Sequence, residues 1–95
     1  MERSYESMIV IVPTISEEDA KKENEKVLSV IQKAKGEIVN TDEWGKKKLA
    51  YEIQKHKEGF YFVNYFKMDA DLITELDRTY RLNENIIRFN ILIKD

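Results

Sequence analysis

The sequence predicts an α+β fold in which four antiparallel strands form one sheet and two helices cover one of its faces. Several segments alternate apolar and polar residues, as half-buried strands do, and two others repeat apolar residues at helical spacing behind a capping residue. The order of these segments is strand, helix, strand, strand, helix, strand. Right-handed crossovers and hairpin pairing fold that order into the ferredoxin-like arrangement.

The first strand and helix are predicted over the N-terminal third of the chain. Residues 5–12 form the strand, which is apolar at every position from Met8 onward and stops at Pro13. Ser16 is a helix N-cap, with acidic residues in the first turn behind it. Gly36 is predicted to end the helix. The helix buries a stripe that Asn24 interrupts, made of Ala20, Val27, Leu28, Ile31 and Ala34.

The middle of the chain predicts a hairpin. A short strand is expected around Ile38 and Val39, and a longer one follows from Trp44 to Ile53, reading W-G-K-K-K-L-A-Y-E-I. Gly45 suits a bulge in that strand. Leu49, Tyr51 and Ile53 share one face, interpreted as the core side, and Lys47 has the same parity. The polar, glycine-terminated segment Lys55–Gly59 is predicted to be the hairpin loop.

The second half of the chain completes the pattern. Residues 60–66 form an aromatic strand, with Phe60, Phe62 and Phe66 on one face and Tyr61, Val63 and Tyr65 on the other. Asp69 is predicted to cap a second helix, whose stripe is Leu72, Ile73, Leu76 and Tyr80. Arg81–Asn85 is then a turn, and Ile86–Ile93 is the last strand. Arg88 and Asn90 point away from its apolar face.

Length and composition limit the possible functions. The 95 residues are expected to form a single domain, residues 1–95. There is no cysteine, which excludes thiol chemistry and cysteine metal sites, and no apolar run is long enough to span a membrane. No signal-peptide pattern is present, so a cytoplasmic protein is the default expectation. The apolar residues Met8, Val10 and Val12 predict an interface on the open sheet face, for a partner or for self-association.

Charge is unevenly distributed along the chain. The formal net charge is −2, which argues against strong non-specific nucleic-acid binding by the chain alone. Between Trp44 and Phe60, however, five lysines stand against Glu52 and Glu58, which gives +3. The sequence thus concentrates positive charge in the predicted hairpin. The alternative interpretation is a solvated lysine cluster that protects an edge strand.

An enzyme is not expected. His56 is the only histidine and lies between lysines, where it is interpreted as a turn residue rather than a catalytic base. The three glycines are isolated, so no phosphate-binding loop exists, and no pair of carboxylates suggests an acid and base in a cleft. No metal or organic cofactor is expected. A ferredoxin-like enzyme or small-molecule-binding protein is kept as a rival hypothesis.

A second rival comes from residues 58–65, E-G-F-Y-F-V-N-Y. They resemble the aromatic signature of RNA-recognition-motif domains, which share this topology and stack RNA bases on the open sheet face. Glu58 stands where that signature has a basic residue and Tyr61 where it has a small one, and the first strand offers no aromatic partner. In this alternative, Phe60 and Phe62 would stack on single-stranded RNA.

Two sequence motifs, which occur in the same order as in a known protein family, support a different function for this chain. G-K-K-K-L-A-Y-E-I, from Gly45 to Ile53, resembles the second-strand signature of the bacterial small-subunit ribosomal protein six family. R-L-N-E-N-I-I-R, from Arg81 to Arg88, resembles that family's turn into the last strand. Tyr5 and Pro13 also fit the family pattern. The similarity covers nearly the whole chain and implies the same ferredoxin-like fold.

This resemblance implies a structural role in the cytoplasmic ribosome. Members of the family bind the central domain of 16S rRNA as a heterodimer with small-subunit protein S-eighteen. A basic partner would offset the acidic charge of this chain. The resemblance places the RNA-binding candidates at the basic positions of its motifs and of the N-terminus, which are Lys46, Lys47, Lys48 and Arg88, with Arg3 and Arg81 as weaker candidates.

Overall fold

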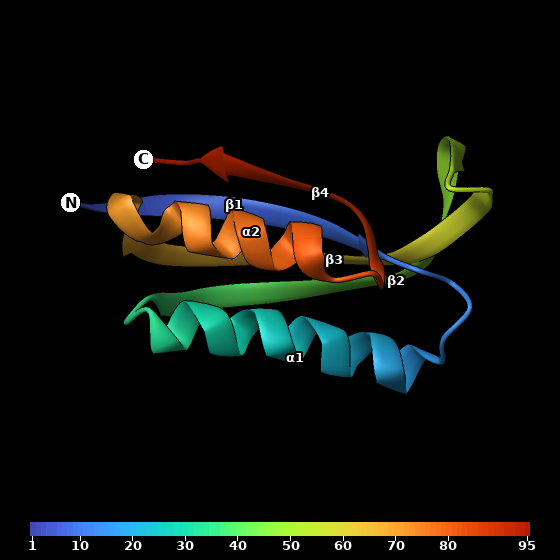
Figure 1. The fold of residues 1–95 in the computed structure, drawn as a ribbon, viewed down its shortest axis with the longest axis horizontal. Helices are drawn as coiled ribbons and strands as arrows, with labels where there is room; N and C mark the ends of the chain where they lie inside the picture. Colours follow the sequence, from blue (N-terminus) through green and yellow to red (C-terminus); the bar gives the residue numbers. More distant parts are fainter.

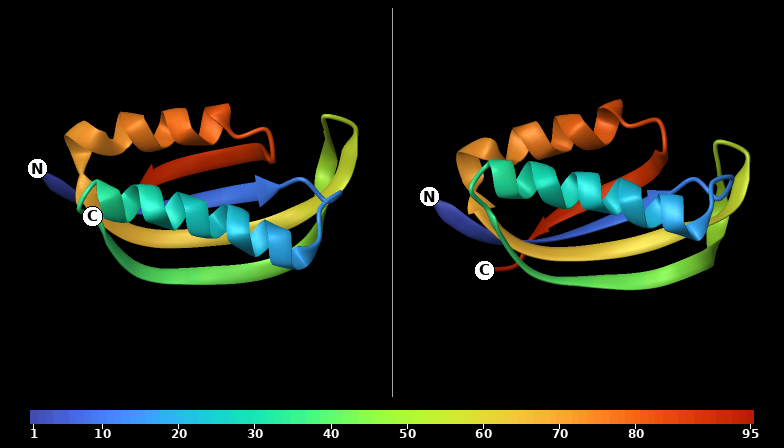
Figure 2. Two further views of the ribbon diagram at one scale, coloured as in Figure 1. Left: turned by 60° about the horizontal axis from the view of Figure 1, so that its bottom comes forward. Right: turned by 90° about the horizontal axis from the view of Figure 1, so that it is seen from below.

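The computed structural model describes residues 1–95 and confirms the predicted order of elements. These are β1 (Glu2–Ile11), α1 (Glu17–Lys33), β2 (Glu37–Ile53), β3 (His56–Asp69), the 3₁₀ turn η1 (Ala70–Leu72), α2 (Ile73–Leu82) and β4 (Ile86–Ile93). The strands form one antiparallel sheet in the order β2-β3-β1-β4 (Figure 1). Both helices lie on the same side of this sheet (Figure 2). The opposite side is called the helix-free face below.

The hydrophobic core lies between the helices and the sheet. Alternate residues of the two central strands face the helices, among them Ile9 and Ile11 of β1 and Phe62 and Phe66 of β3, all buried. They meet the buried stripes of the helices, which are Ala20, Val27 and Ile31 of α1 and Leu76 and Tyr80 of α2. Burial of such apolar and aromatic surface is the main force holding the two layers together.

Helix α1 begins as predicted, because the Ser16 hydroxyl accepts a hydrogen bond from the Asp19 N–H at 3.1 Å. Asn24 interrupts the apolar stripe for a structural reason. It is buried and exchanges two side-chain hydrogen bonds with the buried Asn64 of β3, at 2.8 and 3.3 Å. The two amides therefore satisfy each other inside the core, as buried polar groups must.

The end of α1 differs from the prediction. The residue with positive φ is Lys35, at 63°, and not Gly36. Gly36 is required for another reason: a Cβ atom there would lie 2.9 Å from the carbonyl oxygens of both Ile31 and Lys67. The glycine allows the chain leaving the helix to pass directly against β3.

Strand β2 is a single long strand where the sequence suggested two. Its register against β3 shifts between Ile38 and Asn40 and again between Glu43 and Gly45. These two bulges allow the polar middle segment of β2 to pair with β3 as well. Gly45 has a φ of 75°, which confirms the bulge predicted there.

The predicted loop Lys55–Gly59 is wrong. The turn consists of Gln54 and Lys55, whose φ values are 50° and 69°, and His56 is already paired with Ile53. Two consecutive residues with positive φ form the tight turn that matches the twist of a hairpin. Neither residue is glycine or asparagine, so the sequence carries no signal for this turn.

The C-terminal elements follow the prediction with small changes. Asp69 accepts a hydrogen bond from the Asp71 N–H at 2.9 Å, but the turn that it caps is 3₁₀ rather than α-helical. Leu72, expected in the buried stripe, is 37% exposed because it lies in that turn. Arg81 is helical and not part of a turn, since α2 continues to Leu82.

Candidate nucleic-acid interface

The outer half of the β2–β3 hairpin, residues 45–59, carries a dense group of lysines and is called the basic hairpin below. It carries five lysines and two glutamates. In Figure 1 this segment, coloured yellow-green, extends beyond the ends of β1 and β4. The hairpin therefore presents a net charge of +3 on a projecting element, as the sequence predicted. A projecting, basic element can approach a phosphate backbone without the rest of the acidic chain.

The three consecutive lysines lie on β2, an edge strand of the sheet, and all three are exposed. Lys46 pairs with Phe60, and its Nζ lies 5.2 Å from the centre of the Phe60 ring. Lys47 and Lys48 pair with Gly59 and Glu58. Because side chains alternate along a strand, the lysines surround the edge instead of lying on one face.

Lys47 does not have the core-side orientation expected for its parity. It borders a shallow depression on the helix-free face together with Trp44, Lys48 and Tyr61. The bulge at Gly45 accounts for this orientation. It reverses which residues of β2 point to each face of the sheet, so that residues after the bulge follow the opposite parity to residues before it.

An aromatic pair beside the lysines was missed by the sequence reasoning. The rings of Trp44 and Tyr61 stack with centroids 6.0 Å apart and planes inclined by 12°. Trp44 is 49% exposed, so one face of this pair is open to solvent. The only signal in the sequence was the glycine next to Trp44, which marked the bulge but not the partner ring.

The apolar side of the hairpin lies on the helix-free face, where Leu49 and Ile53 are half-buried against the edge of the core. Leu49, Tyr51 and Ile53 line a cavity together with Met8, Val10 and Tyr61. The predicted open apolar patch is therefore wrong in part: Val10 is 1% and Val12 9% exposed. The hairpin covers surface that the sequence left without a neighbour.

Arg88 of β4 lies beside the basic hairpin. Its guanidinium carbon is 5.4 Å from the centre of the Tyr51 ring, and its Nη1 donates a hydrogen bond to the Tyr51 hydroxyl. Arg88 is exposed and forms no ion pair with a carboxylate. The structure thus brings Arg88 of one edge strand into contact with Tyr51 of the basic hairpin.

Arg3 and Arg81 are not part of this group. Arg3 pairs with Asp95, whose pKa is lowered first by the backbone N–H of Ser4 and then by Arg3. Arg3 also lies at the opposite end of β1 from the hairpin, paired with Met68. Arg81 donates to Asp77 at 2.8 Å. Both guanidinium charges are already balanced by carboxylates.

The base-stacking alternative fails on burial. Phe60 and Phe62 are 5% and 3% exposed and lie in the core beneath the helices. The tyrosine further along the helix-free face, Tyr65, is next to carboxylates: burial, Glu6 and Asp42 together raise the pKa of its phenol. An acidic neighbourhood repels phosphate, so this end of the face is unsuited to RNA.

No arrangement of the side chains suggests catalysis or a membrane span. His56 lies half-buried at the start of β3, opposite Ile53. No group of three or more His, Cys, Asp or Glu residues has the geometry of a metal site. Neither helix is long and apolar enough to cross a bilayer.

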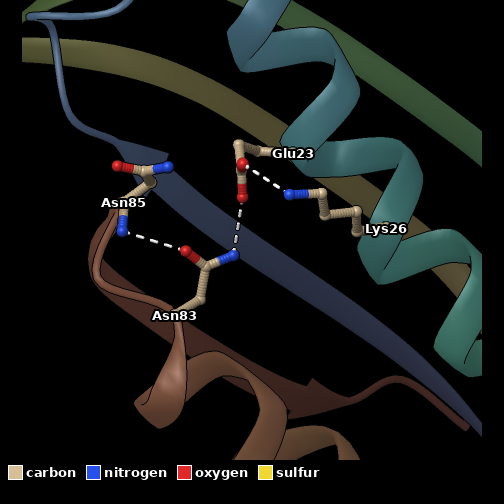
Figure 3. Close-up of polar contacts among 4 residues, drawn as sticks. All are labelled: Glu23, Lys26, Asn83 and Asn85. Carbon is tan, nitrogen blue, oxygen red and sulfur yellow. Dashed lines mark hydrogen bonds and ion pairs between the residues drawn. The ribbon is translucent and has the colours of Figure 1, made fainter.

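The second sequence motif, R-L-N-E-N-I-I-R, connects two elements of the fold (Figure 3). Asn83 donates to Glu23 of α1 at 2.7 Å and accepts from the Asn85 N–H at 2.9 Å. The Asn85 carbonyl accepts from the Val12 N–H at 2.8 Å. The turn between α2 and β4 is thereby fixed to both α1 and the end of β1.

The Glu23 carboxylate of α1, which accepts the hydrogen bond from Asn83, has a lowered pKa in the fold. Burial alone raises the pKa of Glu23, but hydrogen bonds from Asn83, Lys26 and Asn85 outweigh burial and lower it below its usual value. The Lys26 ammonium contributes one of these bonds at 3.0 Å. We call Glu23, Lys26, Asn83 and Asn85 the Glu23 cluster.

Comparison with known proteins identifies the family. The family model described as Ribosomal protein S6 matches residues 4–93. The chain belongs to this family. The small ribosomal subunit protein bS6 of Caldanaerobacter subterraneus is 44% identical over 93 residues, which cover 98% of both chains. The bS6 protein of Helicobacter acinonychis is also 44% identical, over 98% of this chain and 66% of its own length. This chain thus spans about two thirds of the Helicobacter relatives.

Solved structures agree with the S6 assignment. The 30S ribosomal protein S6 of Thermotoga maritima has a TM-score of 0.94 and 39% identity, over 99% of this chain and 89% of that one. The P2 domain of the chemotaxis kinase CheA, from the same organism, has a TM-score of 0.64 at 14% identity and shares the fold alone. Membership in the S6 family confirms the resemblance, the ribosomal location and the expectation of a non-enzymatic protein.

Proposed function

We propose that this S6 family member acts in the small ribosomal subunit by binding the central domain of 16S rRNA together with protein S-eighteen. The observation that carries the RNA-binding part is the basic hairpin, which concentrates +3 on a projecting element of a chain whose net charge is −2. A protein that neutralises phosphates gains affinity by releasing counterions, and only local positive charge can do this here.

Lys46, Lys47 and Lys48 are proposed to contact phosphates. They surround an edge strand, so a phosphate ridge running along that edge would meet all three. Phosphate contacts position a protein on RNA without reading its bases, which suits a structural component. Arg3 and Arg81 are secondary candidates, because each would first have to leave a carboxylate.

The partner protein is proposed for an electrostatic reason as well as from the family resemblance. Three basic contacts give modest affinity at physiological salt, since each neutralised phosphate contributes only part of a typical specific complex. A second, basic chain bound to this one would add contacts and offset the acidic remainder. We therefore expect tight binding to RNA by the pair and weak binding by this chain alone.

The test is titration of a central-domain 16S rRNA fragment, with and without S-eighteen, at several salt concentrations. Lys46→Ala combined with Lys48→Ala should weaken binding by the pair and reduce the log–log salt slope by about 0.7–0.9 per lost phosphate contact. The matched control combines Lys22→Ala with Lys33→Ala, which replace two exposed lysines of α1. This variant should leave the RNA affinity and the salt slope unchanged.

Two results would contradict the proposal. Unchanged affinity and slope in the hairpin variant would mean that the lysines only protect a solvated edge. Equal affinity with and without S-eighteen would contradict the role of the partner.

A further inference from the structure

The segment that follows the three lysines is not held by regular strand pairing. Lys48 pairs with Glu58 and Ile53 with His56, so residues 49–52 of β2 stand opposite Lys57 alone. In a regular ladder each residue has its own partner, and its backbone hydrogen bonds fix its position. The backbone of the basic hairpin is therefore least constrained directly beyond its lysines.

The apolar side chains of this segment are half-buried or exposed, and none is fully buried. Leu49, Tyr51 and Ile53 line a depression of about 180 Å³ that is partly open to solvent. Side chains that face solvent on one side make fewer dispersion contacts with neighbouring residues than core side chains do. Tyr51 remains 60% exposed.

One directional contact crosses the sheet to this segment. Arg88 belongs to β4, and β3 and β1 lie between it and β2. Its guanidinium stacks over the Tyr51 ring at 5.4 Å and also donates a hydrogen bond to the Tyr51 hydroxyl. The combination of cation–π and hydrogen-bond geometry sets both the distance and the direction of the contact.

We propose that Arg88 is a positioning residue for RNA binding: through Tyr51 it holds the basic hairpin in the orientation at which Lys46, Lys47 and Lys48 meet phosphate. This inference rests on the proposed function and refines it. The family resemblance treats Arg88 as a direct RNA contact, whereas the geometry directs its guanidinium at Tyr51.

The two roles make different predictions for Tyr51, which has no charge. If Arg88 acts through Tyr51, then Tyr51→Leu should weaken RNA binding by the complex with S-eighteen, although it removes no positive charge. Arg88→Ala should have a similar effect, about three- to tenfold, as expected for loss of one cation–π contact. The double variant should bind RNA about as tightly as the single variant with the lower affinity, because both changes break the same contact.

Lysine at position 88 separates positioning from simple charge. Arg88→Lys keeps the charge but loses the planar fork that both stacks on Tyr51 and bonds its hydroxyl. A positioning role predicts that Arg88→Lys binds as weakly as Arg88→Ala. A phosphate contact predicts that Arg88→Lys retains most of the affinity and the salt slope. Arg78→Ala, which removes an exposed arginine of α2, is the charge-matched control and should bind normally.

Amide hydrogen exchange of residues 46–58 in the free protein provides a measurement independent of RNA. Exchange of this segment should be faster in Tyr51→Leu and Arg88→Ala, while exchange in α1 and β1 stays unchanged. Equal exchange rates in wild type and both variants would overturn the inference. It would also be overturned if the variants exchanged faster but bound RNA with normal affinity.

The lysine variant distinguishes the two proposals. If Lys46→Ala with Lys48→Ala weakens binding but Tyr51→Leu does not, the positioning role is refuted and the proposed function stands. If the lysine variant binds normally, the proposed RNA contact fails and the positioning role fails with it.

Discussion

Replacing Asn83 by alanine should lower the free energy of unfolding by about 2–3 kcal/mol at pH 7, because a hydrogen bond to a charged group is worth about 1.5–3 kcal/mol. Asn83 donates to a Glu23 carboxylate whose residue is only 8% exposed, so little water can replace the lost bond. The same change removes the acceptor of the Asn85 N–H. A buried carboxylate that loses a partner keeps its desolvation cost, which is the larger part of the effect.

The loss should depend on pH in a defined direction. The pKa of Glu23 is lowered in the folded state, so its contribution to stability is fully present above the unfolded value of 4.5. That contribution disappears as the pH falls through the lower folded pKa. Asn83→Ala raises the folded pKa toward the unfolded one. The gap in stability between wild type and variant should therefore narrow as the pH falls below about 4.5.

Urea unfolding followed by circular dichroism, at pH 7 and at steps below pH 4.5, measures both quantities. The matched control is Asn40→Ala, which removes an exposed amide that bonds the Asp42 side chain, and should cost little. A loss under 1 kcal/mol at pH 7, or a gap that stays constant with pH, would refute the account of the Glu23 cluster. A single cooperative transition in these curves would also support the prediction of one domain over residues 1–95.

Three further stability changes can be measured by the same unfolding experiment. Phe62→Ala should cost about 3–5 kcal/mol because it empties a buried ring position, and a loss near zero would contradict the helix-side orientation of Phe62. Gly36→Ala and Gly45→Ala should both lower the melting temperature, the second because alanine is strained at the φ of 75° that Gly45 adopts. The loss should be larger for Gly36→Ala, because its Cβ meets two backbone oxygens at 2.9 Å whereas Gly45 has open space around it; the reverse order would contradict this close approach. Ser16→Ala should cost about 1 kcal/mol through loss of the helix cap, and unchanged stability would show that water replaces the serine oxygen.

The fold was predictable because its elements depend on local patterns. The strand patterns located β1, β3 and β4, although β1 and β3 start earlier than predicted, at Glu2 and His56. The capping residues Ser16 and Asp69 marked the positions where the helical segments start. Each of these signals arises from a few neighbouring residues, and the crossover rules leave few topologies for that order of elements. The assignment of Phe60 and Phe62 to the face opposite Tyr61 followed from the same alternation.

The face of the sheet that the helices cover was harder to predict. Alternation divides the residues of a strand between two faces but does not indicate which face is buried. Aromatic residues occur on both faces of β3, so the RNA-recognition-motif alternative could assign Phe60 and Phe62 to the open side. The buried amide pair of Asn24 and Asn64 decides the matter, but it joins residues 40 positions apart. Contacts of that separation leave no local pattern.

The candidate site was predicted in composition but not in arrangement. The lysines were visible as a run, whereas the Trp44–Tyr61 stack and the Arg88–Tyr51 contact depend on two bulges and a turn of non-glycine residues. Gln54 and Lys55 adopt positive φ without the residues that normally announce it. Tertiary contacts of the hairpin select this conformation, and a sequence window cannot include them.

The net charge of the chain is a poor guide to its interaction with RNA, because the charges are separated along the sheet. Glu6 lies opposite Tyr65, whereas Lys48 lies opposite Glu58. A separation of seven strand residues corresponds to about 23 Å. At physiological ionic strength the Debye length is about 8 Å, so Glu6 is largely screened from a phosphate bound at Lys48. Asp42, opposite Val63, lies closer to the hairpin than Glu6 does. An RNA strand at the far end of the hairpin therefore encounters mainly the local +3 charge of residues 45–59 rather than the overall −2 charge. The same separation keeps phosphate away from the acidic end of the helix-free face.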